Sequence, residues 1–229
     1  LPQALEFSAM SGSVSLQDNI YRLRLDRLHS PWGSASASAT LNARPPFALR
    51  ATASADLGLQ GRALQANLKA FGTLGDIELR VDGKTGAVTL AGDALAHPFA
   101  ADLTGILPRA RLRASAINLA AWHAAAPVSD LLASVDVMPL HKDALSLSFS
   151  LSNRMPGAWD KQRLPLQSAL GEAYLANHVL RLKQLELALP AGRVSAHGSL
   201  SETALDLQAD VRDVDAAKLM SSLLATRLS

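Results

Sequence analysis

Strict alternation of apolar and polar residues is the feature that most constrains the fold of this chain. It runs through residues 34–41, 49–59, 145–152 and 205–211, where Ala, Leu, Val or Phe occupies every second position. Successive side chains of a β-strand point to opposite faces of the sheet. The alternation therefore predicts long strands, each with one apolar and one polar face.

The last part of the chain contains a complete structural unit. Residues 180–189, 194–200 and 205–211 read as three strands joined by short turns. After Asp213 the apolar residues recur at a spacing of three to four, which predicts a helix over 214–228. Asp213 or Asp215 can cap its first turn. A second short helix is expected over 118–126, with Asn118 as its cap and Pro127 as its end.

Weaker copies of this unit lie upstream. Residues 19–25 and the turn at 31–33 parallel residues 177–183 and the turn at 190–192. In the first copy Leu28 falls out of step with the alternation, which predicts a β-bulge at 26–27. In the second copy the alternation slips by one residue after Lys183. Repeats of this kind determine the architecture. We expect one repeat unit over 1–140, including the short helix and a linker, and another over 141–229. Together they would form one continuous, groove-shaped part of a longer protein.

The composition excludes several classes of protein. Of the 229 residues 48% are hydrophobic, which is too apolar for a disordered chain. No apolar run approaches the length needed to span a bilayer. The formal net charge of +2 is small for a nucleic-acid binder. There are no cysteines, so disulfides and thiolate metal sites are excluded.

No motif indicates catalysis. Gly83-Lys84-Thr85 resembles the end of a P-loop, but position 78 holds Glu78 instead of glycine, and a strand pattern follows. We expect a hairpin turn at Asp82-Gly83 instead. The six histidines occur singly, without the spacing of a zinc site. We therefore expect neither enzyme activity nor a cofactor nor a bound metal.

Basic residues alternate along several predicted strands. Arg109, Arg111 and Arg113 project to one side, as do Arg22 and Arg24. Such groups could contact phosphate headgroups. The simpler interpretation is a solvated outer face that also protects strand edges from pairing.

The repeated apolar face is the candidate site. Only 4% of the residues are aromatic, whereas a closed core of this size normally uses more large rings. The face either packs against another layer or lines a groove that is partly open to an apolar guest. The groove candidates are Ala35, Ala37, Ala39, Leu41, Leu49, Ala51, Ala53, Leu57, Leu145, Leu147, Phe149, Leu151, Leu187, Leu205, Leu207, Ala209 and Val211.

The pattern as a whole resembles the AsmA-like superfamily, which includes TamB and YdbH. The resemblance rests on residues 180–189, Pro190-Ala191-Gly192, Gly198-Ser199-Leu200 and residues 205–219, and more faintly on residues 118–121. It implies a mainly β fold in which long antiparallel strands form a curled sheet, a β-taco-like groove, with two short amphipathic helices. The resemblance covers most of the chain. It is a general pattern of alternating apolar and polar residues and does not include a fixed sequence motif.

The resemblance also implies a function. Members of this superfamily extend through the periplasm of Gram-negative bacteria from an inner-membrane anchor and are implicated in phospholipid transport. We therefore expect a segment of a bridge that carries phospholipid acyl chains between the membranes. An inner-membrane anchor would lie outside these residues, and an outer-membrane barrel of the TamA type would be a partner. The alternative is an assembly scaffold with a closed apolar core. A hydrolase or sugar-binding module would need clustered carboxylates or more exposed aromatic rings.

Overall fold

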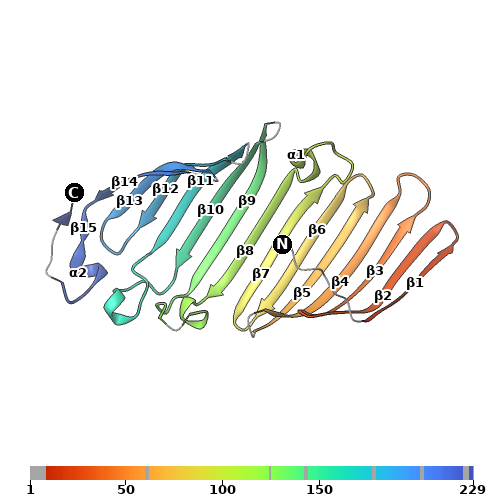
Figure 1. Ribbon diagram of the computed structural model, residues 1–229, viewed down its shortest axis with the longest axis horizontal. Helices are drawn as coiled ribbons and strands as arrows, with labels where there is room; N and C mark the ends of the chain where they lie inside the picture. Colours follow the sequence, from red (N-terminus) through yellow and green to blue (C-terminus); the bar gives the residue numbers. More distant parts are fainter. Residues whose placement is uncertain are drawn as a thin grey trace. The chain divides into compact units, whose positions relative to one another are not determined.

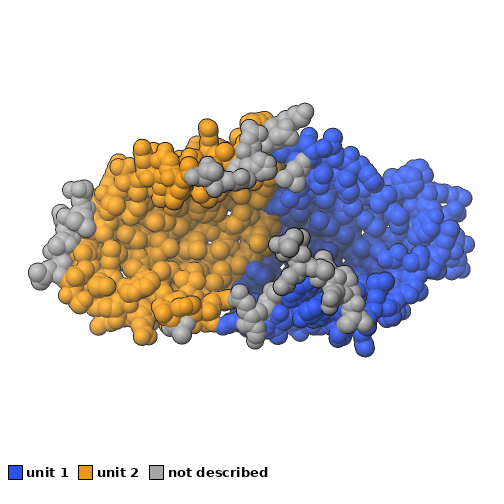
Figure 2. Space-filling model, in the orientation of Figure 1, with its two compact units in different colours: residues 1–110 blue, residues 111–229 orange. Residues whose placement is uncertain are grey.

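The protein is mainly β, as the alternation predicts. The computed structural model describes residues 9–59, 62–123, 125–141, 144–176, 179–201, 204–223 and 227–228. Neighbouring strands are antiparallel and follow one another in chain order (Figure 1). The chain divides into two compact units, Leu1–Ala110 and Arg111–Ser229, which Figure 2 shows in different colours. We describe each unit by itself.

Unit 1 is an antiparallel sheet in which each strand pairs with its neighbours in the sequence. A short helix, α1, follows β7, and β8 begins at the end of the unit. The elements are β1 (Ala9–Gln17), β2 (Ile20–Ser30), β3 (Gly33–Asn42), β4 (Ala48–Leu59), β5 (Arg62–Thr73), β6 (Ile77–Thr85), β7 (Val88–Ala96), α1 (Leu103–Ile106) and β8 (Arg109–Ile117).

Unit 2 repeats this plan with strands β9 to β14. Two 3₁₀ turns, η1 and η2, lie in its connections, and a pair of two-residue strands flanks the short helix α2. The elements are η1 (Leu119–Ala121), β9 (Leu131–His141), β10 (Ala144–Asn153), η2 (Trp159–Lys161), β11 (Ser168–Ala176), β12 (Val179–Ala188), β13 (Arg193–Leu200), β14 (Leu205–Arg212), β15 (Val214–Asp215), α2 (Ala216–Leu219) and β16 (Arg227–Leu228).

The predicted bulge in β2 is present, and a register shift also accompanies the one-residue slip in the alternation of β12. The β2–β3 register shifts between Leu25 and Leu28, and the β12–β13 register shifts between Leu182 and Leu185. Each shift precedes a turn whose glycine has a positive φ, 140° in the first copy and 101° in the second. The two segments that resemble each other in sequence therefore also share a local structure.

The units divide at Ala110/Arg111. The repeat boundary expected at 140/141 lies within the β9–β10 hairpin, and the division into two repeat units stays a prediction. The predicted hairpin turn at Asp82-Gly83 is wrong, because β6 continues to Thr85 and the chain turns at Gly86. Gly83 lies inside β6, and a glycine at such a position cannot be distinguished by sequence alone from a glycine in a turn.

The helix predicted over 118–126 is much shorter in the structure. It is reduced to the 3₁₀ turn η1, although the Asn118 cap is confirmed by its side-chain oxygen, which accepts from the Ala120 amide at 3.2 Å. Ala124 lies outside the described residues. A single helical turn is unfavourable to nucleate and needs a packed face to extend. The structure instead places a short helix, α1, at Leu103–Ile106, which the alternation did not indicate.

The helix predicted over 214–228 is also wrong in length. α2 covers only Ala216–Leu219, capped by Asp215, and Met220 is already extended. The two residues before α2 pair with β16, while 224–226 lie outside the described residues. Leu223 remains 50% exposed, so the expected apolar stripe has no packed surface that would sustain a longer helix.

Asp160 connects η2 to the segment that follows α2. Its two carboxylate oxygens accept from the Ser221 amide at 2.9 Å and the Ser221 hydroxyl at 2.5 Å. The side-chain hydrogen bond and then the backbone hydrogen bond from Ser221 lower the pKa of Asp160 below its ordinary value. Because the folded pKa is lowered, the stabilisation is present above the pKa of the unfolded chain and is lost as the pH falls through the folded value.

This contact gives a pH-dependent prediction. Amide exchange at Ser221 should accelerate when the pH falls below about 4, the ordinary pKa of an aspartate, after correction for the intrinsic exchange rate. NMR-detected exchange measures it. In an Asp160→Asn variant, which lacks the titratable carboxyl group, the corrected rate should not change across this pH range. A wild-type rate that stays independent of pH across this range would contradict the prediction.

Candidate functional site

In unit 1 the register aligns the apolar residues of neighbouring strands into rows. Ala37 of β3 lies opposite Ala53 of β4, and Ala53 lies opposite Leu68 of β5. The other candidates of this unit belong to the same face: Ala35, Ala39 and Leu41 lie opposite Ala55, Ala51 and Leu49, and Leu57 lies opposite Gly33. The structure therefore brings all eight unit 1 candidates onto one face.

Unit 2 has an apolar face of the same kind. Leu147 of β10 lies opposite Ala173, and Leu207 of β14 lies opposite Gly198. The rows are Leu151–Ala169–Leu187–Val194–Val211, Phe149–Gly171–Leu185–Ala196–Ala209, Leu147–Ala173–Leu182–Gly198–Leu207 and Leu145–Leu175–Leu180–Leu200–Leu205. All nine candidates of unit 2 share this face.

These faces are only partly covered. No large side chain among the described residues is fully buried. The main contacts of each strand are with its hydrogen-bonded neighbours, and a second layer over the sheets is not among the described elements. At the edge strands the exposed fraction is high, 69% for Val14 and 71% for Leu205. The apolar faces are thus available to a guest or a partner.

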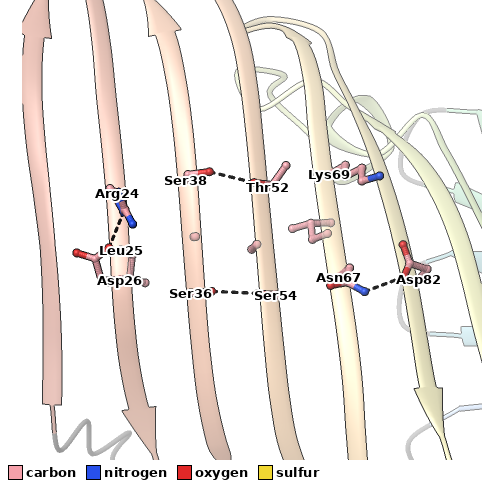
Figure 3. Close-up of a pocket in the computed structure, with 13 residues that line it drawn as sticks. Arg24, Leu25, Asp26, Ser36, Ser38, Thr52, Ser54, Asn67, Lys69 and Asp82 are labelled. Atoms are coloured by element: carbon pink, nitrogen blue, oxygen red, sulfur yellow. Dashed lines mark hydrogen bonds and ion pairs between the residues drawn. The ribbon is translucent and has the colours of Figure 1, made fainter.

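The largest cavity that we describe lies on the opposite, polar face of unit 1 (Figure 3). It has a volume of about 800 Å³ and extends from β2 to β6. The hydroxyl groups of Ser36 and Ser54 form a hydrogen bond, as do those of Ser38 and Thr52. In each pair the oxygens are 3.0 Å apart. The walls carry the charged groups Arg24, Asp26, Lys69 and Asp82.

A second cavity of about 590 Å³ adjoins the first on the same face. Four cationic side chains line it, Arg22, Arg24, Arg50 and Lys69, together with Phe71. No carboxylate is among its lining residues. Arg24 and Lys69, labelled in Figure 3, line both cavities. This cavity is therefore positively charged.

The cavity of unit 2 has the opposite charge. It has a volume of about 380 Å³ and is lined by Asp136, Glu172 and Glu186. Each carboxylate has a partner: Asp136 pairs with Arg111, Glu172 accepts from Lys183 at 2.9 Å, and Glu186 accepts from the Gln184 amide at 2.6 Å. The hydrogen bonds to Glu172 and then to Tyr174 raise the pKa of Lys183. Asp136 and Glu172 are thus each paired with a cation of the protein, whereas Glu186 has only the hydrogen bond from the neutral Gln184 side chain.

Two of the remaining candidates for chemistry have structural partners. Arg109 lies 3.8 Å from Asp93, and His97 lies 2.7 Å from Asp76. Within the described part of the chain, no three acidic or histidine side chains come together as a metal site. Sequence reasoning found the apolar faces but missed the cavities of the polar faces. The signal for them is the register between strands, which brings together residues far apart in the sequence.

Comparisons of the chain with protein-family models, with curated proteins and with solved structures found no match. Among the described helices, none has the length and apolar character required to cross a membrane.

Proposed function

We propose that the apolar faces bind the acyl chains of phospholipids, and that the protein is a segment of a bridge carrying phospholipid between the inner and outer membranes. The observation that supports this most is the set of apolar rows that no described layer covers, such as Leu147–Ala173–Leu182–Gly198–Leu207. Large exposed apolar surfaces on proteins commonly mark sites of interaction.

The physical argument concerns the cost of moving lipid through water. Each methylene that leaves the bilayer costs about 0.8 kcal/mol, so a whole acyl chain costs on the order of 10 kcal/mol. A continuous apolar surface removes most of this cost without chemistry. An eight-residue strand is about 26 Å long, and the alanines at 37, 39, 51 and 53 leave room beside it. No cofactor is required for such a role.

The wider setting of this proposal follows from the resemblance to the AsmA-like superfamily. The protein would act in the periplasm, held to the inner membrane by an anchor outside these residues. An outer-membrane barrel of the TamA type is the protein partner that we expect. The alternative, an assembly scaffold, requires a filled apolar core, and the absence of fully buried large side chains among the described residues favours the open surface.

Leu207 offers the sharpest test, because it lies within an apolar row and is 55% exposed. A Leu207→Glu variant should fold normally, since the side chain is not part of a closed core, but its charge should repel acyl chains. Gln208→Glu adds the same group to the opposite face of β14 and is the matched control. We expect several-fold less co-purified phospholipid in the first variant and an unchanged amount in the second.

Mass spectrometry of extracted lipid and transfer of a fluorescent phospholipid between vesicles are the measurements. Circular dichroism and the thermal midpoint verify folding of both variants. Wild-type protein that carries no lipid and transfers none would contradict the proposal. Equal losses in the two variants would contradict it as well, because the effect would then not depend on the apolar face.

A further inference from the structure

The basic cavity on the polar face of unit 1 has features that a solvated surface does not require. Its cations come from β2, β4 and β5. All three strands are paired on both sides, so these charges do not protect a sheet edge. The cavity therefore needs another explanation.

The cations are incompletely neutralised by the protein. Arg24 pairs with Asp26 at 2.5 Å, and Arg22 reaches the Gln17 side chain at 3.5 Å. For Arg50 and Lys69 the described residues provide neither an ion pair nor a hydrogen bond to the charged group. Two of the four cations thus retain their full capacity to bind an anion.

The register also places like charges together. Lys69 lies directly opposite Arg80 across the β5–β6 pair. Arg80 interacts with its neighbours, 3.9 Å from Glu78 and 4.9 Å from the centre of the Phe71 ring. Like charges in directly opposed positions destabilise a sheet. A bound anion would offset this repulsion.

Hydroxyl groups occupy the floor between the cations. Thr40 lies opposite both Arg22 and Arg50, so the two guanidinium groups arise from strands about 10 Å apart with a threonine between them. The Ser38–Thr52 hydroxyl pair lies beside it and can donate one further hydrogen bond. Arginine binds phosphate oxygens through two parallel hydrogen bonds. Together these groups match a tetrahedral oxyanion.

From this arrangement we infer that the cavity binds the phosphate group of a phosphate ester. Arg50 and Lys69 supply the charge, Arg22 and Arg24 the flanking donors, and Phe71 a surface for the organic part of the ligand. The volume of about 590 Å³ suits a small molecule or a lipid headgroup. The site lies on the face opposite the apolar rows and is therefore independent of acyl-chain binding.

A double substitution tests this inference. Arg50→Gln/Lys69→Gln removes one arginine and one lysine from the cavity. Arg27→Gln/Lys84→Gln removes the same two charges from other positions of unit 1 that do not line either cavity. Calorimetric titration with inorganic phosphate and with glycerol 3-phosphate measures binding. We expect Kd to rise about tenfold or more in the cavity variant and to remain within about twofold in the control.

Vesicles distinguish the source of the phosphate. Binding of the wild type to phosphatidylglycerol vesicles in excess of phosphatidylcholine vesicles, lost only in the cavity variant, would assign the site to a lipid headgroup. Binding of glycerol 3-phosphate alone would assign it to a soluble ester. The inference is overturned if the wild type binds none of these probes, or if the two double variants lose binding equally. Transfer of a fluorescent phosphatidylcholine between vesicles should be unchanged in the cavity variant, which separates this site from the proposed acyl-binding function.

Discussion

Replacement of Asn153 by leucine is expected to lower the free energy of unfolding by about 4 kcal/mol. Asn153 ends β10 and is only 7% exposed. Its side-chain oxygen accepts from the amides of Asp130 at 3.3 Å and Met155 at 3.1 Å. Its amide nitrogen donates to the carbonyls of Leu164 at 3.2 Å and Leu166 at 3.0 Å. The substitution leaves four backbone groups without these partners.

Urea-induced unfolding followed by circular dichroism measures this effect. Asn67→Leu is the control, because Asn67 is exposed and makes a single 2.9 Å hydrogen bond to Asp82. The control should change the stability by less than about 1 kcal/mol. Equal effects of the two substitutions would show that the burial of Asn153 contributes little.

A second substitution distinguishes the role of the Asn153 side-chain oxygen from that of its side-chain nitrogen. Asn153→Asp retains an oxygen facing the two amides but places the other oxygen against two carbonyls. Repulsion there disfavours the charged form, so the pKa of the introduced carboxyl group should be raised. The variant should therefore be least stable at neutral pH and should regain stability as the pH falls and the group is protonated.

The fold class could be predicted from the sequence because each strand carries its own signal. Residues 145–152 form β10 almost as the alternation predicts. The slip at 26–27 predicted a bulge because one extra residue reverses the faces of everything that follows it. Such signals are local, and the structure preserves them.

The candidate faces could be predicted for the same reason, whereas the cavities could not. Alternation assigns Ala37 and Ala53 to the apolar side but does not state which strand is opposite which. Arg50 and Lys69 are far apart in the sequence and reach one cavity only through the β3–β4 and β4–β5 registers. Nothing in the sequence around Asn153 indicates that its side chain is buried.

The lengths of the helices could not be predicted from the sequence. Asn118 and Asp215 are correct caps, yet the helices after them are only three and four residues long. A cap fixes where a helix begins, while its length depends on a surface to pack against. The absence of that surface around Leu223, which is half exposed, is a property of the tertiary structure.

Gly33→Ala should destabilise unit 1 by about 2–4 kcal/mol. Gly33 starts β3 with a φ of 140°, a conformation that L-residues rarely adopt. A Cβ atom at this position would lie 2.0 Å from the Asp56 carbonyl oxygen and 2.9 Å from the Leu57 Cα atom. Both are backbone atoms of β4, so relief requires the β3–β4 pairing to open at its end.

Gly58→Ala, near the same end of the β3–β4 pair, is the matched control. A Cβ atom there would meet nothing closer than the Trp32 carbonyl oxygen at 3.8 Å, and Gly58 has no positive φ. The control should be neutral or stabilise by up to about 1 kcal/mol, because alanine restricts the unfolded chain. Thermal unfolding of both variants checks the pair. Similar midpoints would contradict the assigned turn geometry, and with it the register that aligns the apolar rows and the basic cavity.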